Sequence, residues 1–315
     1  MKLKKLLVIL LCVLLTAVSF AACGSNEEAA APPAEQTPVA EETNAVEEAA
    51  LAYFANFPAD RHVISPADFF TKIDAGEEMF IIDIRSADDY AKGHIKGAVN
   101  LPFGNGSIAQ NLEIIPDDVS VYVYCYTGQT ASQTTAVLNV AGKPAYNVQS
   151  GFVRGISVEP NFENYLSTDP VDLPADTYEV NSDIKAAVEE YYATVASYAG
   201  TPTEAQNIKV ENVKEIVDSE SDDYMIVSVR KAEDYAKGHV KGAVNIPFGA
   251  GMQDSLVELP KDKKIIVYCY TGQTASQTVA ILRLLGYEAY NMQFGMGSVE
   301  TKSGWLGAGF ETVTE

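Results

Sequence analysis

The stretch VYCYTGQTASQT at residues 123–134 recurs without a single change at residues 267–278. In each copy a cysteine, Cys125 or Cys269, follows an apolar run that is typical of a buried strand. A glycine three residues later permits backbone angles closed to other residues, and a helix-like segment follows it. In an open parallel sheet, ligands bind at this end of the strands. The sequence therefore predicts a duplicated unit with one thiol site in each copy.

A second duplicated stretch precedes the first in each copy. Residues 89–104 read DYAKGHIKGAVNLPFG, and residues 234–249 differ from them only at two apolar positions. Apolar runs that predict strands alternate with segments that predict helices around both stretches. We therefore expect an α/β fold with two domains, each a central parallel sheet flanked by helices on both faces. The expected strands are residues 79–84, 98–100, 119–124 and 145–149 in the first copy, and 225–229, 265–268 and 289–293 in the second.

The duplication also sets the expected domain boundaries. We assign residues 61–157 to the first repeat and residues 205–315 to the second repeat, each large enough for its own core. Residues 158–204 form a linker, in which apolar residues at helical spacing predict a helix over 181–198. Residues 23–60 are rich in Ala, Glu, Pro and Thr, so we expect a flexible acidic tether there.

The first 22 residues have the pattern of a secretory signal peptide. Lysines at the N-terminus precede an apolar run over residues 6–18, and two alanines stand directly before Cys23. A cysteine at that place, followed by Gly24 and Ser25, resembles the lipobox of bacterial lipoproteins. The resemblance implies lipid on Cys23 and a chain anchored to a bacterial membrane on its extracytoplasmic side. The alternatives are an ordinary signal peptide and a transmembrane anchor, although the apolar run is shorter than the roughly 20 residues that a span needs.

Charge and cysteine content restrict the function further. The formal net charge of −21 argues against nucleic acid as a partner, because phosphate binding needs a basic surface. Once Cys12 leaves with the signal peptide and Cys23 carries lipid, Cys125 and Cys269 are the remaining thiols. A disulfide between them would need the two repeats to face each other loop to loop, so we expect free thiols.

The loop after each cysteine predicts an anion site. Small and polar residues let successive backbone N–H groups turn inward, and the following helix adds the positive end of its dipole. Such a loop stabilises a thiolate or a persulfide on the cysteine without a neighbouring histidine. The alternative is a buried, inert cysteine at a strand end, which is common for lone cysteines.

Three motifs together resemble the rhodanese family of sulfurtransferases. They are Asp83-Ile84-Arg85, the segment GHIKGAVN at residues 93–100, and the pattern Cys125-x-x-Gly128-x-Thr130-Ala131. The resemblance covers residues 60–155 and 205–310, and it implies nucleophilic catalysis by Cys125 and Cys269 through a persulfide. It also implies that the loop residues bind the substrate: Tyr126, Thr127, Gly128, Gln129, Thr130, Ala131, Tyr270, Thr271, Gly272, Gln273, Thr274 and Ala275.

Details of the motifs refine this resemblance. Thr130 and Thr274 stand where many single-domain members have arginine, which disfavours a related phosphatase that clamps phosphate with that side chain. We expect Arg85 and Arg230 to form buried structural ion pairs with nearby carboxylates. His94 and His239 lie in turns that resemble loop-bracing features, so we do not expect them to act as bases. Ser228 replaces Asp83 in the second repeat, with no consequence that the sequence defines.

The leading hypothesis is a sulfurtransferase with two competent cysteine sites. Its partners would be a small sulfur-containing donor, such as thiosulfate, mercaptopyruvate or a persulfide, and a thiol-type acceptor. We expect no cofactor and no metal, and contact with the membrane only through the lipid on Cys23. One alternative is a non-catalytic module that captures sulfur species or a partner protein, and another is a thiol redox protein that forms a Cys125–Cys269 disulfide.

Overall fold

The structure, a computed structural model, describes residues 44–314. The expected signal peptide, the lipid site at Cys23 and residues 23–43 of the expected tether lie outside the described residues. Both repeats belong to one compact unit. Within residues 44–314, no helix is long and apolar enough to cross a membrane.

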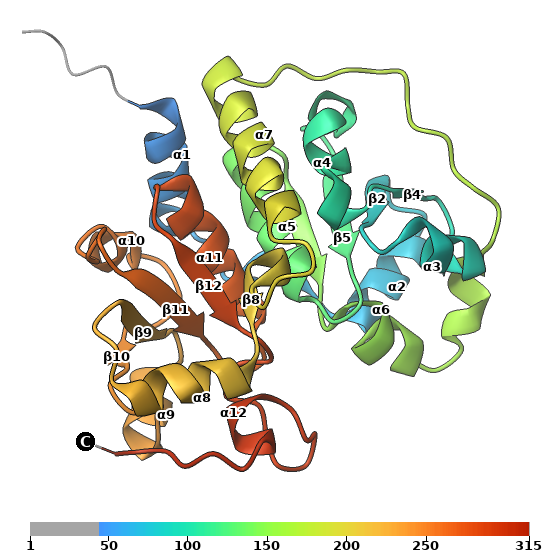
Figure 1. The fold of residues 1–315 in the computed structure, drawn as a ribbon. Helices are drawn as coiled ribbons and strands as arrows, with labels where there is room; N and C mark the ends of the chain where they lie inside the picture. Colours follow the sequence, from blue (N-terminus) through green and yellow to red (C-terminus); the bar gives the residue numbers. More distant parts are fainter. Residues whose placement is uncertain (1–43, 315) are drawn as a thin grey trace, which may run out of the picture. The chain divides into compact units, whose positions relative to one another are not determined.

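The first repeat is built on five parallel strands in the order β1-β6-β5-β2-β4 (Figure 1). The strands are β1 (Val63–Ile64), β2 (Met79–Asp83), β4 (Ala98–Asn100), β5 (Ser120–Tyr124) and β6 (Ala145–Val148). The helices are α2 (Pro66–Asp74), α3 (Ala87–Lys92), α4 (Ser107–Gln110), α5 (Gln129–Val140) and α6 (Gly151–Arg154). Short 3-10 helices lie at η1 (Phe103–Asn105), η2 (Leu112–Ile114), η3 (Ile156–Val158) and η4 (Phe162–Tyr165). A separate antiparallel pair joins β3 (His94–Ile95) to β7 (Leu166–Ser167).

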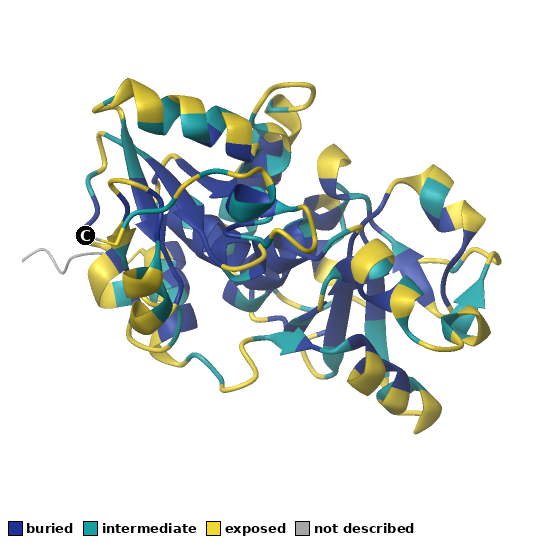
Figure 2. Cartoon of the chain, turned by 90° about the horizontal axis from the view of Figure 1, so that it is seen from below, coloured by how far each residue is buried: buried dark blue, intermediate teal, exposed yellow. Residues whose placement is uncertain are grey.

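The second repeat has the same topology, with five parallel strands in the order β10-β9-β11-β12-β8. The strands are β8 (Asn207–Ile208), β9 (Tyr224–Ser228), β10 (Val244–Asn245), β11 (Lys264–Tyr268) and β12 (Ala289–Met292). The helices are α8 (Val210–Ser219), α9 (Ala232–Lys237), α10 (Gln253–Leu256), α11 (Gln273–Leu284) and α12 (Gly304–Gly307), with a 3-10 helix η5 (Glu204–Gln206) before β8. Figure 2 shows dark, buried strands between helices whose outer faces are exposed. The expected α/β fold with two parallel sheets is confirmed.

The central strands explain the unbroken apolar runs of the sequence. Helices cover both faces of each sheet. The last four residues of β5 and of β11 are therefore all buried, whichever face of the sheet their side chains point to. The expected strands are all present, with ends that differ by at most one residue. The edge strands β1 and β8 contain only two residues each, too few for any periodic pattern.

Helix α1 (Ala45–Ala55) corrects the expected tether, which was to continue to residue 60. Asn44 caps the helix, and Ala50, Tyr53 and Phe54 are buried in the core shared by both repeats. These side chains repeat at helical spacing, so they form one apolar face within a segment whose overall composition is acidic and alanine-rich. The amino-acid composition of this segment therefore does not reveal the helix. The phenol of Tyr53 donates a hydrogen bond of 2.9 Å to Gln277.

Helix α7 (Ser182–Ser197) confirms the helix predicted in the linker. It packs with α1 on the two helices that follow the cysteine loops, α5 and α11, which lie side by side (Figure 1). Tyr191 and Tyr192 are buried there, and their hydroxyls bond to Gln133 and Thr134 of α5. The linker therefore contributes to the core that joins the two repeats.

The buried face of α1 can be tested by truncation. Phe54→Ala should lower the free energy of unfolding by about 3–5 kcal/mol, because a fully buried ring leaves a cavity. Glu48→Ala, on the exposed side of the same helix, should change it by less than about 0.5 kcal/mol. Urea denaturation followed by circular dichroism measures both. Equal, small effects would mean that the segment is a tether after all.

Candidate functional site

The two cysteines lie at the carboxyl ends of the central strands, as the sequence predicts. Cys125 follows β5 and Cys269 follows β11, and their exposed fractions are 2% and 1%. The backbone N–H of Gly128 donates to Sγ of Cys125 over 3.1 Å, and that of Gly272 donates to Cys269 over 3.1 Å. An amide aimed at each sulfur favours negative charge there. Both thiols are free.

Each cysteine loop is held from behind by the turn that follows the next strand. The N–H of Phe152 donates to the carbonyl of Cys125 over 2.7 Å, and the N–H of Met296 donates to that of Cys269 over 2.8 Å. A Cβ atom at Gly151 or Gly295 would overlap the backbone of the loop it supports. These glycines allow the close approach that fixes the loop geometry.

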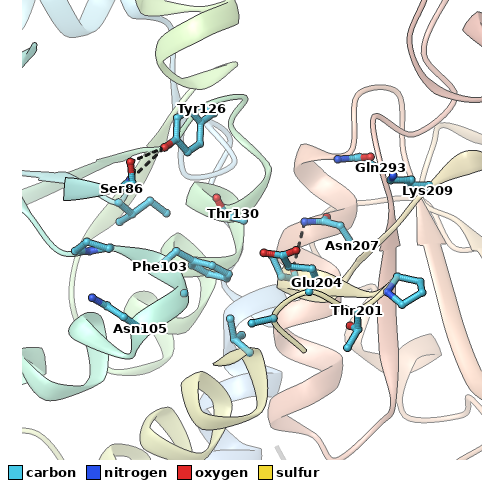
Figure 3. Close-up of a pocket in the computed structure, with 18 of the residues that line it drawn as sticks. Ser86, Phe103, Asn105, Tyr126, Thr130, Thr201, Glu204, Asn207, Lys209 and Gln293 are labelled. Carbon is cyan, nitrogen blue, oxygen red and sulfur yellow. Dashed lines mark hydrogen bonds between the residues drawn. The ribbon is translucent and has the colours of Figure 1, made fainter. Parts of the chain in front are cut away.

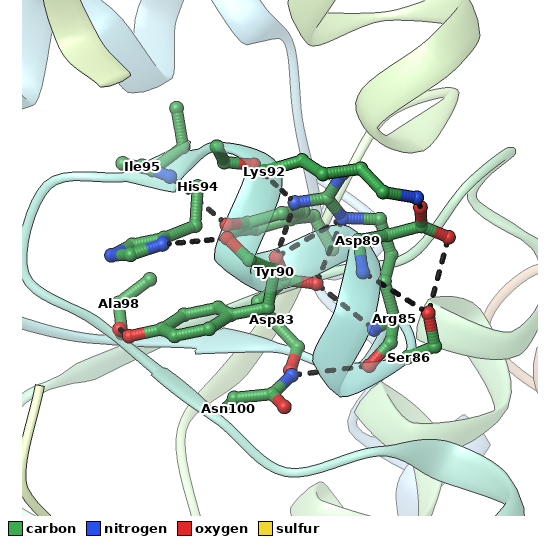
Figure 4. Close-up of polar contacts among 12 residues, drawn as sticks. Asp83, Arg85, Ser86, Asp89, Tyr90, Lys92, His94, Ile95, Ala98 and Asn100 are labelled. Atoms are coloured by element: carbon green, nitrogen blue, oxygen red, sulfur yellow. Dashed lines mark hydrogen bonds and ion pairs between the residues drawn. The ribbon is translucent and has the colours of Figure 1, made fainter. Parts of the chain in front are cut away.

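Arg85 forms the buried ion pair that the sequence predicts (Figure 4). Its Nη2 atom lies 2.6 Å from Oδ2 of Asp83 and donates to the carbonyl of Gly93 over 2.7 Å. Its guanidinium carbon also lies 3.9 Å from the ring centroid of Phe152. Together these contacts link the end of β2 to the turn behind the cysteine loop.

The corresponding prediction for Arg230 is wrong. Ser228 occupies the place of Asp83, and among the described residues Arg230 has no carboxylate within ion-pair distance. Its Nη2 atom donates to the carbonyl of Gly238, whereas its buried Nε atom has no hydrogen-bond partner. The second repeat therefore keeps the buried guanidinium and lacks the charge that balances it in the first.

The two histidines brace their turns. His94 is buried, stacks on Tyr90 at 3.7 Å and bonds to the Tyr90 carbonyl through Nδ1 over 2.9 Å. His239 repeats this arrangement with Tyr235, at 3.8 Å and 3.0 Å. Neither ring lines one of the cavities at the cysteine loops. The expectation that they act as structural residues fits this geometry.

Tyr126 and Tyr270 lie half-exposed beside the cysteines, with hydroxyls already engaged. Tyr126 donates to Oδ2 of Asp89 over 2.6 Å, and Tyr270 donates to Asp234 over 2.6 Å. Hydrogen bonds from Lys92 and then from Tyr126 hold the pKa of Asp89 below its usual value. Each loop therefore has a neutral aromatic ring and an ionised carboxylate at its edge.

Gln129 and Gln273 cross between the repeats, which the sequence does not predict. The Oε1 atom of Gln273 accepts a hydrogen bond of 2.8 Å from the N–H of Ser150, behind the loop of the first repeat. The Oε1 atom of Gln129 accepts one of 2.9 Å from the N–H of Phe294, at the equivalent place in the second. These oxygens therefore hold the opposite loop, a contact between repeats that the assignment to substrate binding did not include, and Gln273 also lines the cavity at Cys269. The Nε2 atom of each glutamine donates to the threonine two residues earlier in its own loop.

The remaining loop residues divide into core and cavity positions. Ala131 and Ala275 are fully buried and line neither cavity. A Cβ atom at Gly128 would overlap Oε1 of Gln273, and Gly272 meets Gln129 in the same way. Tyr126, Thr130, Tyr270, Thr271 and Thr274 line cavities.

A cavity lies in front of each cysteine loop, and both repeats line it. The first, of about 940 Å³, has Ser86, Tyr126 and Thr130 on one side and Lys209 and Gln293 on the other (Figure 3). The second, of about 500 Å³, is lined by Cys269, its loop and residues of the first repeat. The cross-repeat residues Arg61, Gln149, Lys209 and Gln293 are missing from the sequence-based assignment, because they lie outside the recurring motifs and no local pattern marks them.

Comparisons with known proteins agree with this geometry. The family described as the rhodanese-like domain matches residues 65–155 and 209–302, together more than half of the chain. The chain is 36% identical over 94 residues to the thiosulfate sulfurtransferase GlpE of Pseudomonas entomophila, covering 30% of this chain and 76% of that protein. It is 30% identical over 115 residues to an HTH-type transcriptional regulator of Mycobacterium tuberculosis, covering 36% of this chain and 50% of that one.

A solved structure is also similar to this chain. It is that of SseA from Escherichia coli, described as a 3-mercaptopyruvate sulfotransferase, at 18% identity and a TM-score of 0.34, over 73% of this chain and 97% of that chain. The chain spans half or less of the length of the first curated relatives it matches.

The crossed glutamines make a reciprocal prediction. Gln273→Met keeps the size of the side chain and removes the acceptor, so the amide of Ser150 should exchange with solvent about tenfold faster. The amide of Phe294 should be unaffected. Gln129→Met should produce the opposite pattern. Hydrogen exchange measured by NMR reads both amides in each protein, and equal changes at the two amides would contradict the crossed arrangement.

Proposed function

The chain belongs to the rhodanese-like domain family, and on this premise we propose that it is a sulfurtransferase whose Cys125 and Cys269 each carry sulfur as a persulfide. The observation that supports this most directly is the backbone N–H at 3.1 Å from each sulfur, in two loops of identical sequence. Relatives named as sulfurtransferases support a function in sulfur transfer in general terms.

The loading step uses the cysteine as a nucleophile. The thiol first loses its proton to solvent, and the thiolate attacks the outer sulfur of a donor such as thiosulfate. The Sγ–S bond forms as the S–S bond of thiosulfate breaks, and sulfite leaves with the electron pair of that bond. The cysteine persulfide carries one negative charge, which the amides of the loop stabilise.

The unloading step reverses the roles. A thiolate acceptor attacks the outer sulfur of the persulfide, and the cysteine leaves as a thiolate that the same amides stabilise. No external oxidant or reductant is needed, because sulfur moves at a constant oxidation level. The cavities in front of the two loops, about 940 Å³ and 500 Å³, provide room for donors and acceptors of small-molecule size.

We also propose that the chain acts outside the cytoplasmic membrane of a bacterium, anchored by lipid on Cys23. The support is the signal-peptide pattern of residues 1–22 and the cysteine that follows two alanines. The proposed domains are residues 61–157 and 205–315, joined by the linker at 158–204. Helix α1 places ordered structure from residue 45 onward, so a tether in this arrangement is confined to residues 23–43.

A second candidate is a module that binds sulfur species or a partner protein without turnover. The near-complete burial of both sulfur atoms favours it, because an acceptor must reach the persulfide for transfer to occur. The free thiols and separate strand ends give no support to the redox alternative, in which the two cysteines pair.

Intact mass after incubation with sulfur donors distinguishes these candidates. Wild-type protein should gain the mass of two sulfur atoms from thiosulfate, mercaptopyruvate or a low-molecular-weight persulfide. Cys125→Ser and Cys269→Ser should each gain one, and the double variant none. Adding a thiol acceptor should return each mass to its starting value.

Each other outcome has a defined meaning. Loading that no thiol can discharge would support the binding module instead of the enzyme. Absence of loading by every donor, or loading that persists in the double variant, would overturn the proposed function. A loss of two hydrogens from the untreated wild type, absent from both single variants, would indicate a disulfide.

A further inference from the structure

The two cysteine sites have identical loops and different surroundings. Superimposing the repeats by sequence pairs Ser86 with Lys231 at the start of α3 and α9, and Asp83 with Ser228 at the ends of β2 and β9. Each pair differs by one unit of positive charge in favour of the second repeat. Both positions lie at the carboxyl end of the strand next to the cysteine strand.

The first difference is the buried charge of Arg230. Its side chain is 6% exposed, its Nε atom has no partner, and no described carboxylate pairs with it. Its guanidinium carbon lies 5.8 Å from the ring centroids of Tyr268 and Tyr270, the residues on either side of Cys269. In the first repeat Asp83 neutralises the equivalent charge at 2.6 Å. A buried charge without a counter-ion is screened little by solvent and acts on its neighbours at this range.

The second difference lies in the cavity walls. The cavity in front of the Cys125 loop is lined by Tyr126 and Thr130 but not by Cys125 itself, and its charged residues are Lys209 and Glu204, whose charges cancel. The cavity at Cys269 contains Lys231, Asp60 and Arg61, with one positive charge in excess. Arg61 has no ion pair among the described residues, while Lys231 lies 3.8 Å from Glu233 with both side chains well exposed. Because this ion pair is long and exposed to solvent, Glu233 neutralises only part of the charge of Lys231.

The acidic groups at the loop edges do not cancel this difference, because each site has one carboxylate in the same place. After hydrogen bonds from Lys237 and Tyr270, the charge of Arg230 also helps to hold the pKa of Asp234 below its usual value, but Asp234 is not within ion-pair distance of Arg230. Asp89 bonds to Tyr126 and Lys92, and Asp234 bonds to Tyr270 and Lys237, with nearly equal distances. Relative to the Cys125 site, the Cys269 site therefore has the stronger positive potential.

We propose that the two sites divide the donors: the Cys269 site takes small anionic sulfur donors such as thiosulfate, and the Cys125 site does not favour them. This inference rests on the proposed sulfurtransferase function. The cavity of about 500 Å³ fits a small donor, and it contains Cys269 in its wall. The positive potential serves both the approach of the dianion and the departure of sulfite, which carries two negative charges from the same step.

Single-cysteine proteins test the division. Cys125→Ser isolates the Cys269 site, and Cys269→Ser isolates the Cys125 site. The rate of persulfide formation is followed by intact mass against thiosulfate concentration. We expect half-maximal rate at about tenfold lower thiosulfate for the Cys269 site. Sodium sulfate, as an inert dianion, should inhibit the Cys269 site more than sodium chloride of equal ionic strength does. At the Cys125 site the two salts should inhibit equally.

Exchanging the differing residues supplies matched variants. In the Cys125→Ser protein, Ser228→Asp should pair with Arg230 as Asp83 does with Arg85, and Lys231→Ser should remove the exposed charge. Each should raise the half-maximal thiosulfate concentration two- to fivefold or more. In the Cys269→Ser protein, Ser86→Lys should lower it. Because Lys231→Ser and Ser86→Lys are surface changes, they remain informative if Ser228→Asp does not fold.

The outcomes distinguish a failure of the proposed division of donors from a failure of the proposed sulfurtransferase function. Equal thiosulfate and sulfate responses at the two sites, or no effect of the exchanged residues, would overturn the division of donors. Loading of both sites by a persulfide with none by thiosulfate would also overturn it, while leaving the sulfurtransferase intact. Absence of loading from every donor would overturn the proposed function itself.

Discussion

The packing of α5 against α11 is the interaction on which the rest of the structure depends. Both helices begin at the residue after a cysteine-loop glycine, so their contact brings the two loops to the same region of the molecule. Gln129 and Gln273 then reach across and accept hydrogen bonds from backbone amides behind the opposite loop. Helices α1 and α7, from outside the two repeats, cover the same pair. The cysteine loops are therefore fixed by tertiary contacts as much as by their own turns.

This arrangement makes each cavity a joint product of both repeats. The cysteine loop supplies one wall, and residues next to the edge strand of the other repeat supply the opposite wall, with Lys209 after β8 in one case and Arg61 before β1 in the other. Duplication of the loop thus did not duplicate the whole site. The motifs give both cysteines the same immediate geometry, whereas positions outside the motifs, such as Ser86 and Lys231, give the two cavities different charges.

The sequence predicts the local features of this protein well and the contacts between repeats poorly. The strand before each cysteine, the glycine turn and the ion pair of Arg85 follow from apolar runs and motifs. Helix α1 escapes prediction because four buried side chains are spread through an acidic, alanine-rich segment. The role of Gln129 escapes it because a loop residue gives no sign of its partner in another repeat. Ser228 in the sequence already shows that the counterpart of Asp83 is absent, but only the structure shows that no other carboxylate within residues 44–314 takes its place beside Arg230.

The overlap between Gly128 and Gln273, and between Gly272 and Gln129, has a consequence for how such a chain can change over time. A substitution at either glycine displaces a glutamine that belongs to the other repeat, and a longer side chain at either glutamine collides with the opposite glycine. A change at one of these four positions is therefore felt by the opposite loop as well. After a duplication, one copy of a segment can normally accumulate substitutions independently of the other. Here each cysteine loop contacts a glutamine of the other repeat. The identity of residues 123–134 and 267–278 is what such mutual constraint would preserve.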